Sequence, residues 1–226
     1  MQLYIGNKNY SSWSMRPWVL MTELGIPFEE VPLRLDWAPD SPFKKTLLKL
    51  APTGRVPLLV DAGFAVWDTL AIVEYLAESC PDRRIWPEAK KARARARSLC
   101  AEMHAGFGAL RERFPMNIEA SLPEIGARCI AEFPAVAADL SRIDTMWTEQ
   151  LAASGGPFLF GPFTAADAYF APVAARLKTY APPIGSAASA YVERVLALRS
   201  VRSWCDAARA EHDFIKEDEP YRDEAR

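Results

Sequence analysis

The sequence predicts an α/β domain followed by an all-helical domain, because the spacing of its apolar residues changes once along the chain. Up to about residue 80, short apolar segments with strand-like alternation are separated by helix-like segments. Beyond Cys80-Pro81 the alternation gives way to long segments rich in Ala, Arg and Glu with helical periodicity. The chain has 226 residues, half of them hydrophobic, which is enough for two modest cores. We expect an α/β domain over residues 1–80, a linker over 80–88, a helical domain over 88–212 and a charged tail over 213–226.

The elements of the first domain follow the order β-α-β-α-β-β-α. Gly25 is a natural stop for the first helix, since glycine readily adopts the left-handed conformation that follows a helix. Ala62-Gly63 separates two short apolar segments and so predicts a hairpin turn. The expected elements are a strand over 2–6, a helix over 15–24, a strand over 28–35, a short helix over 43–50, hairpin strands over 58–61 and 64–67, and a helix over 69–79.

The second domain is expected to contain helices only. Its periodic segments are separated by Pro and Gly clusters such as Gly155-Gly156-Pro157, which interrupt helices. The end of the chain is charged and contains Pro220, so we expect a tail with little order of its own. The expected helices cover about 88–114, 123–153, 164–179, 187–198 and 200–211.

Composition and charge argue against several kinds of partner. The formal net charge is −2, so no positive excess favours nucleic acid or an anionic membrane surface. No apolar run approaches the roughly 20 residues that a membrane span needs, and no leader-like segment is evident. The four cysteines are widely spaced and only two histidines are present, so we expect no metal site and no disulfide framework. We expect a reduced, cytoplasmic protein.

The first strand-helix turn carries the sequence Ser11-Ser12-Trp13-Ser14. Amides of a first helical turn, together with the positive end of the helix dipole, favour an anion, and a nearby hydroxyl can donate to it. A bound thiolate is an anion of this kind. The alternative is that one serine, most plausibly Ser14, only caps the helix. Arg16 could add positive charge here, or could form a surface or interdomain salt bridge.

Two later turns carry further candidate binding groups. The bond between Val56 and Pro57 precedes the third strand; it is either a cis peptide that exposes the Val56 backbone to an extended peptide, or a trans proline starting an edge strand. Asp68-Thr69 precedes the next helix and could hold the amino and carboxylate groups of an α-amino acid. The alternative for this pair is helix capping alone.

Taken together, these motifs resemble those of the cytosolic glutathione transferases over about residues 1 to 212. Ser11-Ser12-Trp13-Ser14 resembles the Ser-Ser-Cys-Ser turn of the zeta class, with Trp13 in place of the cysteine. The segments 53–57 (Thr-Gly-Arg-Val-Pro) and 68–72 (Asp-Thr-Leu-Ala-Ile) resemble the family's glutathione-binding turns, and Thr164-Ala165-Ala166-Asp167 its capping box. The resemblance implies a thioredoxin-like first domain and glutathione as co-substrate, without a metal.

The resemblance also implies roles for individual residues. Ser11, with Ser12 as the nearest alternative, would donate to the glutathione sulfur. Val56, before Pro57, would pair through its backbone with the cysteinyl part of glutathione. Asp68 and Thr69 would hold the γ-glutamyl end. Lys44 or Arg55 would meet the glycyl carboxylate.

The electrophile is expected where the first helix of the second domain faces Ser11. Residues at helical spacing there could line its pocket beside Trp13, although Met and Phe at this spacing also suit a core and a histidine can be structural. The residues concerned are Trp13, Met103, His104, Phe107 and Arg111.

The function implied is conjugation of the glutathione thiolate to small, mainly apolar electrophiles, a detoxification activity carried out by a homodimer. A wall of this composition would also suit an electrophile bearing a carboxylate. Two alternatives remain. One is a glutathione-dependent cis-trans isomerase of the maleylacetoacetate type, which Trp13 would handicap. The other is a non-catalytic interaction module that keeps the fold.

Overall fold

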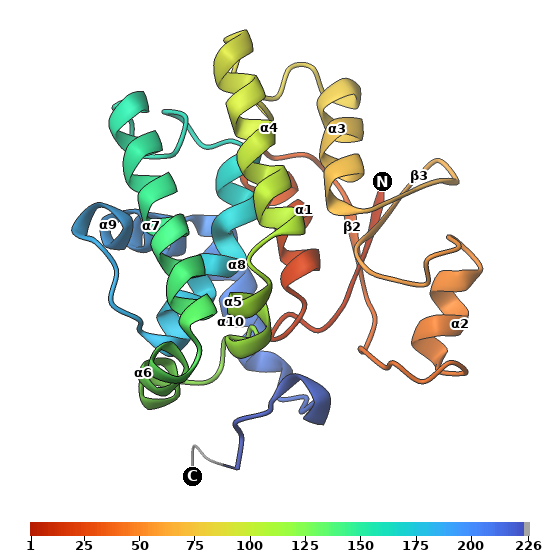
Figure 1. Cartoon of the computed structure of the whole chain (residues 1–226). Helices are drawn as coiled ribbons and strands as arrows, with labels where there is room; N and C mark the ends of the chain where they lie inside the picture. The colour runs from red at the N-terminus through yellow and green to blue at the C-terminus, as the bar shows by residue number, and fades with distance from the viewer. Residues whose placement is uncertain (224–226) are drawn as a thin grey trace.

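The computed structural model describes residues 1–223 and contains an N-terminal α/β domain and a helical domain (Figure 1). The α/β domain has one four-stranded sheet of order β2-β1-β3-β4. Strands β1 and β2 are parallel, whereas β1 with β3 and β3 with β4 are antiparallel. Its elements are β1 (Gln2–Ile5), α1 (Ser12–Glu23), β2 (Glu29–Pro32), α2 (Pro42–Leu48), β3 (Leu58–Asp61), β4 (Phe64–Trp67) and α3 (Thr69–Ser79).

The two faces of this sheet belong to different cores. Side chains alternate along a strand, so neighbouring residues face opposite sides. Leu3, Ile5 and Leu59 join the large core that contains α1 and α3. Leu58 joins a second, smaller core with Phe43 of α2. The sheet is therefore covered on both faces.

The helical domain is built around α8, whose residues are almost all buried. Helix α8 packs against α1, α4, α6 and α9, and so joins the two domains (Figure 1). The expected capping box is present, because Thr164 and Asp167 bond each other's backbone at its start. The helices are α4 (Lys90–Ala105), α5 (Gly108–Arg113), α6 (Pro123–Glu132), α7 (Pro134–Ser154), α8 (Ala165–Tyr180), α9 (Ser186–Ala197) and α10 (Arg199–Glu211), followed by a 3-10 turn, Lys216–Asp218.

Several expected element boundaries need correction. The single helix expected over 88–114 is divided into α4 and α5, because Phe107 has a left-handed φ of 55°. The helix expected over 123–153 is divided before Pro134, which cannot donate to a preceding turn. Helix α1 begins at Ser12 rather than Met15. Among residues 1–223, no helix is both long and apolar enough to cross a membrane.

The tail was expected to have little order of its own, and this expectation is corrected for its described part. Ile215 is only 3% exposed and packs in the smaller core beside Tyr10 and Leu35. Burial of an isoleucine removes apolar surface from water, which fixes the chain on either side of it. Ile215 therefore holds this part of the chain against the α/β domain, while Tyr221 contacts the helical domain.

Candidate functional site

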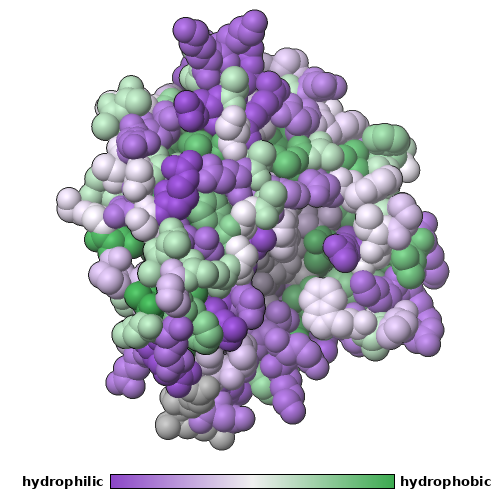
Figure 2. All heavy atoms as spheres, in the orientation of Figure 1, coloured by the Kyte–Doolittle hydropathy of each residue, from purple (hydrophilic) through white to green (hydrophobic). Residues whose placement is uncertain are grey.

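A cavity of about 670 Å³ lies where loops of the α/β domain face α4, α5 and α8. Figure 2 shows the molecule hollowed between its helical part and the lobe that carries α2. The cavity brings together most of the residues singled out from the sequence. These are Ser11, Ser12, Trp13, Lys44, Arg55, Val56, Pro57, Asp68, Thr69, His104 and Arg111.

Met103 and Phe107 do not line the cavity, contrary to expectation. Both are buried in the large hydrophobic core. Met103 lies on the face of α4 that it shares with Leu99 and Cys100, and Phe107 follows the break after α4. The core alternative for these two side chains is therefore the correct one.

Ser11 and Ser14 form a hydrogen-bonded pair at the start of α1. Ser11 is the N-terminal flanking residue of the helix, and its side chain caps no helix amide. Its hydroxyl lies 2.7 Å from that of Ser14. Ser14 lies inside the first turn and accepts the N–H of Gly6 at 3.2 Å. The capping role considered for Ser14 is therefore wrong, and the Ser14 oxygen instead accepts hydrogen bonds from the Ser11 hydroxyl and the Gly6 amide.

Ser12 has a different partner, the buried guanidinium of Arg176. Nη2 of Arg176 donates to the Ser12 hydroxyl at 3.1 Å, and its Nε donates to the carbonyl of Phe114 at 2.7 Å. Burial lowers the pKa of Arg176 to about 9. Because Ser12 accepts from a cation, its own hydrogen remains available to an anion in the cavity.

Arg16 lies beneath this corner and forms no salt bridge within residues 1–223, so that alternative is wrong. It is 2% exposed, and its Nε and Nη1 have no hydrogen-bond partner among the described residues. Its guanidinium lies 4.1 Å from the Trp13 ring centroid and 4.9 Å from that of Tyr169. Desolvation lowers the pKa of Arg16 to about 10, so it remains cationic at neutral pH. A buried cation without a carboxylate partner favours an anion nearby.

Asp68 and Thr69 form the second polar corner, at the start of α3. Asp68 accepts the N–H of Leu70 at 2.8 Å, so it caps the helix. Its other oxygen lies 3.3 Å from Nε2 of His104. Thr69 accepts the Tyr169 hydroxyl at 2.9 Å and lies 3.5 Å from Nδ1 of His104. Capping and cavity lining thus coexist in these two residues.

His104 and Arg111 flank Trp13 on the helical side of the cavity. The His104 ring meets the indole edge-on at 4.9 Å, and the Arg111 guanidinium lies 5.8 Å from the indole centroid. Arg111 donates to the carbonyls of Met103 and His104. Desolvation lowers the pKa of His104, and nearby Arg16 and Arg111 lower it further against the opposing effect of Asp68. His104 is therefore predominantly neutral at pH 7.

The opposite end of the cavity is formed around the Val56-Pro57 turn. The peptide bond between these residues is cis, which is one of the two forms that the sequence left open. Lys44 donates to the carbonyl of Gly54 at 2.9 Å and lies 5.7 Å from the Trp37 ring centroid. Arg55 is exposed at the rim. Two cations thus lie at this end.

Sequence reasoning missed several lining residues. Arg176 had a detectable signal, because an arginine flanked by the apolar residues Ala175 and Leu177 in a largely apolar helix needs a buried role. Trp37 and Asp218 had none, since they lie in a loop and in the expected tail. The lining residues missed are Tyr10, Leu35, Trp37, Thr53, Trp67, Pro115, Met116, Arg176 and Asp218.

Chemically, the cavity offers hydroxyl donors and an excess of arginine beside a helix start. In the described part of the chain, no group of three or more His, Cys, Asp or Glu side chains could hold a metal ion. The fold and site define a two-domain protein of the thioredoxin-like class, with an anion-binding corner facing a helical domain. Family models match the glutathione S-transferase N-terminal domain over residues 10–79 and its C-terminal domain over residues 92–207. The chain belongs to the glutathione S-transferase family.

Curated relatives are similar over part of the chain. Maleylacetoacetate isomerase of Rattus norvegicus is 30% identical over 109 residues, which cover 48% of this chain and 50% of the relative. The match thus spans about half the length of that relative. A zeta-class glutathione S-transferase of Euphorbia esula is 36% identical over 77 residues, or 34% of this chain and 33% of the relative.

Solved structures resemble nearly the whole chain. A glutathione transferase homologue from Burkholderia, solved with bound glutathione, has a TM-score of 0.69 and 25% identity, covering 92% of this chain and 98% of its own. A bacterial maleyl pyruvate isomerase of the zeta class has a TM-score of 0.70 at 22% identity, covering 94% of this chain and 100% of its own. The second likeness is one of fold alone.

Proposed function

We propose that this protein is a glutathione transferase in which a serine hydroxyl stabilises the glutathione thiolate. The observation that carries the proposal is Ser11 at the start of α1, which lines a cavity with arginines around it and is hydrogen-bonded to the buried Ser14 at 2.7 Å. The thiolate is the nucleophile, and a free alkyl thiol is ionised only to a few per cent near neutral pH. The hydroxyl and the cations favour the ionised form.

The cavity supports a placement of glutathione along its length. Its sulfur would lie against Ser11, with Ser12 as the alternative donor. The backbone of Val56, before Pro57, would pair with the cysteinyl part. Asp68 and Thr69 would hold the γ-glutamyl end, and Lys44 or Arg55 the glycyl carboxylate. In this proposal residues 1–80 bind glutathione, and residues 88–212 supply the electrophile wall, with the linker between them.

The electrophile wall supports small, partly apolar substrates, and its cations taken by themselves would also suit a carboxylate. Trp13 supplies an aromatic surface, while His104 and Arg111 add polar edges. In conjugation the sulfur forms a bond to the electrophilic carbon. A leaving group departs with the bonding electron pair, or an activated double bond takes up a proton at its other carbon.

A second candidate function is cis-trans isomerisation of a maleyl-type diacid. The observation that favours it is a set of three arginines that suits a dianion: Arg16 and Arg111 beside Trp13, and Arg176 bonded to Ser12. Relatives named as isomerases agree with it. The thiolate would add to the double bond, rotation would follow about the new single bond, and elimination would regenerate glutathione. Trp13, in place of the cysteine of the zeta-class motif, argues for conjugation.

Titration of bound glutathione tests the proposal. Ultraviolet absorbance of the thiolate against pH should show a pKa lowered by about one to two units in the parent. Ser11→Ala should return this pKa towards its free value, and Ser12→Ala should do so only if Ser12 is the donor. No change in either variant would overturn the serine mechanism. Failure of the protein to bind immobilised glutathione would favour the non-catalytic interaction module.

Assembly and location belong to the same proposal. We propose a cytoplasmic homodimer with a detoxification role. Phe64 of β4 is 63% exposed and its ring centroid lies 6.1 Å from that of Tyr75 on α3, and apolar side chains gathered at the surface are typical of contact surfaces. Sedimentation of the parent and of Phe64→Glu tests the dimer: the parent should sediment as a dimer and the variant as a monomer.

A further inference from the structure

The C-terminal segment, defined here as residues 213–223, closes one side of the cavity. Arg34 forms an ion pair with Asp213 at 2.9 Å and donates to the carbonyl of Phe214 at 3.2 Å. Ile215 is buried in the smaller core. Tyr221 donates to the carbonyl of Arg113 at 3.0 Å. The segment is thus attached to both domains.

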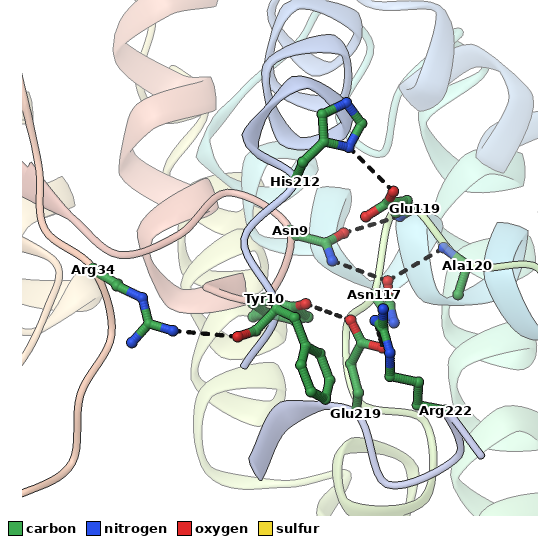
Figure 3. Close-up of polar contacts among 10 residues, drawn as sticks. Asn9, Tyr10, Arg34, Asn117, Glu119, Ala120, His212, Glu219 and Arg222 are labelled. Carbon is green, nitrogen blue, oxygen red and sulfur yellow. Dashed lines mark hydrogen bonds and ion pairs between the residues drawn. The ribbon is translucent and has the colours of Figure 1, made fainter. Parts of the chain in front are cut away.

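A hydrogen bond beside Ser11 fixes the middle of this segment. The Tyr10 hydroxyl donates to the Glu219 carboxylate, which also pairs with Arg222 at 2.9 Å (Figure 3). The side chain of Glu219 is only 7% exposed. Burial, and then the Glu219 hydrogen bond, raise the pKa of Tyr10, so its hydroxyl stays a donor. Tyr10 itself lines the cavity.

Asp218 is the neighbour of Glu219 and lines the cavity as well. Its Oδ2 is buried and has no hydrogen-bond partner within residues 1–223. A buried carboxylate oxygen without a donor loses hydration that nothing replaces. Burial accordingly raises the pKa of Asp218, as do the neighbouring Glu217 and Glu219. Because Asp218 lines the cavity, a rotation of its carboxylate would turn the unpaired oxygen to the cavity, where a ligand that supplies a donor would offset this cost.

Asp68, the other carboxylate among the described lining residues, differs from Asp218 in its contacts. One oxygen of Asp68 accepts the Leu70 N–H, and the other lies 3.3 Å from Nε2 of His104. The cationic lining residues Arg111 and Arg176 are held by backbone carbonyls of the helical domain. Asp218 therefore adds a carboxylate oxygen without a hydrogen-bond donor to a cavity that otherwise favours anions.

We propose that Asp218 is a specificity-determining residue of the electrophile subsite, which selects small electrophiles bearing a hydroxyl group and disfavours those bearing a carboxylate. Tyr10 and Glu219 are positioning residues that hold Asp218 at the cavity. The inference rests on the proposed glutathione transferase function. It goes beyond that function because it assigns the C-terminal segment a part in choosing the substrate.

The test compares matched electrophiles. The probes are a straight-chain enal, the same enal with a γ-hydroxyl, and a chain-matched enal ending in a carboxylate, each conjugated to glutathione. For Asp218→Asn, kcat/KM for the hydroxy-enal relative to the plain enal should fall about tenfold, since a hydrogen bond to a charged acceptor is the stronger kind. The same variant should raise kcat/KM for the carboxylate-bearing enal relative to the plain enal, because a like charge is removed.

Two further variants keep the test decisive. Asp223→Asn makes the same chemical change at an exposed carboxylate of the same segment that does not act on the pKa of Asp218, and should keep the parent ratios. Glu219→Ala leaves Asp218 in the chain but removes its support, and should lower the hydroxy-enal ratio in the same direction as Asp218→Asn. The inference would be overturned if Asp218→Asn left both kcat/KM ratios, for the hydroxy-enal and for the carboxylate-bearing enal relative to the plain enal, at the parent's values. It would also be overturned if both ratios moved in the same direction. A parent that conjugates none of the three enals would instead count against the proposed function.

Discussion

Ser14 lies directly behind Ser11 and joins it to the end of β1. Its hydroxyl oxygen is 2.7 Å from that of Ser11 and 3.2 Å from the amide nitrogen of Gly6. Gly6 has no room for a side chain, because a Cβ there would lie 2.5 Å from Leu35 and 3.1 Å from the Ser11 hydroxyl. In the structure the Ser11 hydroxyl donates to Ser14. When Ser11 turns its hydrogen to an anion in the cavity, the Ser14 hydroxyl becomes free to donate to Ser11, and hydrogen bonds in such a chain polarise one another.

Replacing Ser14 with alanine should therefore weaken thiolate stabilisation without touching glutathione. We expect the pKa of the bound thiol to rise by about half a unit, less than in Ser11→Ala. The free energy of unfolding should fall by about 1 kcal/mol, because the Gly6 amide loses its acceptor. Thiolate absorbance and urea denaturation measure the two effects. Ser98→Ala, at an exposed serine of α4, is the control. An unchanged pKa of the bound thiol in Ser14→Ala would contradict the proposed effect of Ser14 on Ser11.

Replacing Arg16 with an apolar residue should stabilise the fold and weaken the stabilisation of the thiolate. Arg16→Met removes a buried cation that has no carboxylate partner, and apolar replacement of buried charge is often stabilising. We expect the free energy of unfolding to rise by about 1 kcal/mol, while the pKa of bound glutathione also rises. Denaturant titration and thiolate absorbance give the two readouts.

Arg176→Met is the matched control, because it makes the same chemical change at a guanidinium that is hydrogen-bonded. The carbonyl of Phe114 and the Ser12 hydroxyl would lose their donor, so stability should fall by about 2 kcal/mol. Equal effects of the two substitutions on unfolding would show that the missing partners of Arg16 do not matter.

His104 should make stability depend on pH. Its folded pKa is lowered from 6.5, chiefly by burial, so the unfolded chain binds the proton first as pH falls. Protonation thus favours unfolding, and stability falls as pH drops below about 6.5. His104→Gln should lose less stability than the parent between about pH 7.5 and pH 5.5. Chemical denaturation at both pH values measures the difference in stability. A larger loss in the variant than in the parent would contradict a lowered pKa of His104 in the folded protein.

Gly126 should be intolerant of a side chain although it lies inside a helix. A Cβ there would lie 2.0 Å from the carbonyl oxygen of Tyr180, a backbone atom of α8. Gly126→Ala should destabilise the protein by about 3 kcal/mol or more, against the usual preference of helices for alanine. Gly108→Ala is the matched control: its Cβ meets nothing within 4 Å, and a gain of about 0.5 kcal/mol is expected. Thermal unfolding of both variants provides the comparison.

The parts of the fold that sequence reasoning predicted depend on local chemistry. The hairpin about Ala62-Gly63 and the capping box of Thr164 and Asp167 each follow from a few neighbouring residues. The division of the expected helix at Phe107 does not, because a left-handed phenylalanine is unfavourable locally and is held by burial in the core. Met103 was misplaced for a related reason, since periodicity identifies a buried face but not what that face meets.

The sequence by itself determined the two-domain order, the serine-bearing turn and the polar corners at Val56-Pro57 and Asp68-Thr69, because each is encoded within a few consecutive residues. Tertiary structure alone decided which groups meet across the cavity. Arg176 reaches Ser12 across 164 positions, and Glu219 reaches Tyr10 across 209. Such contacts arise from the packing of α8 on α1 and of Ile215 in the smaller core, and long-range packing of this kind leaves no periodic signal in the chain.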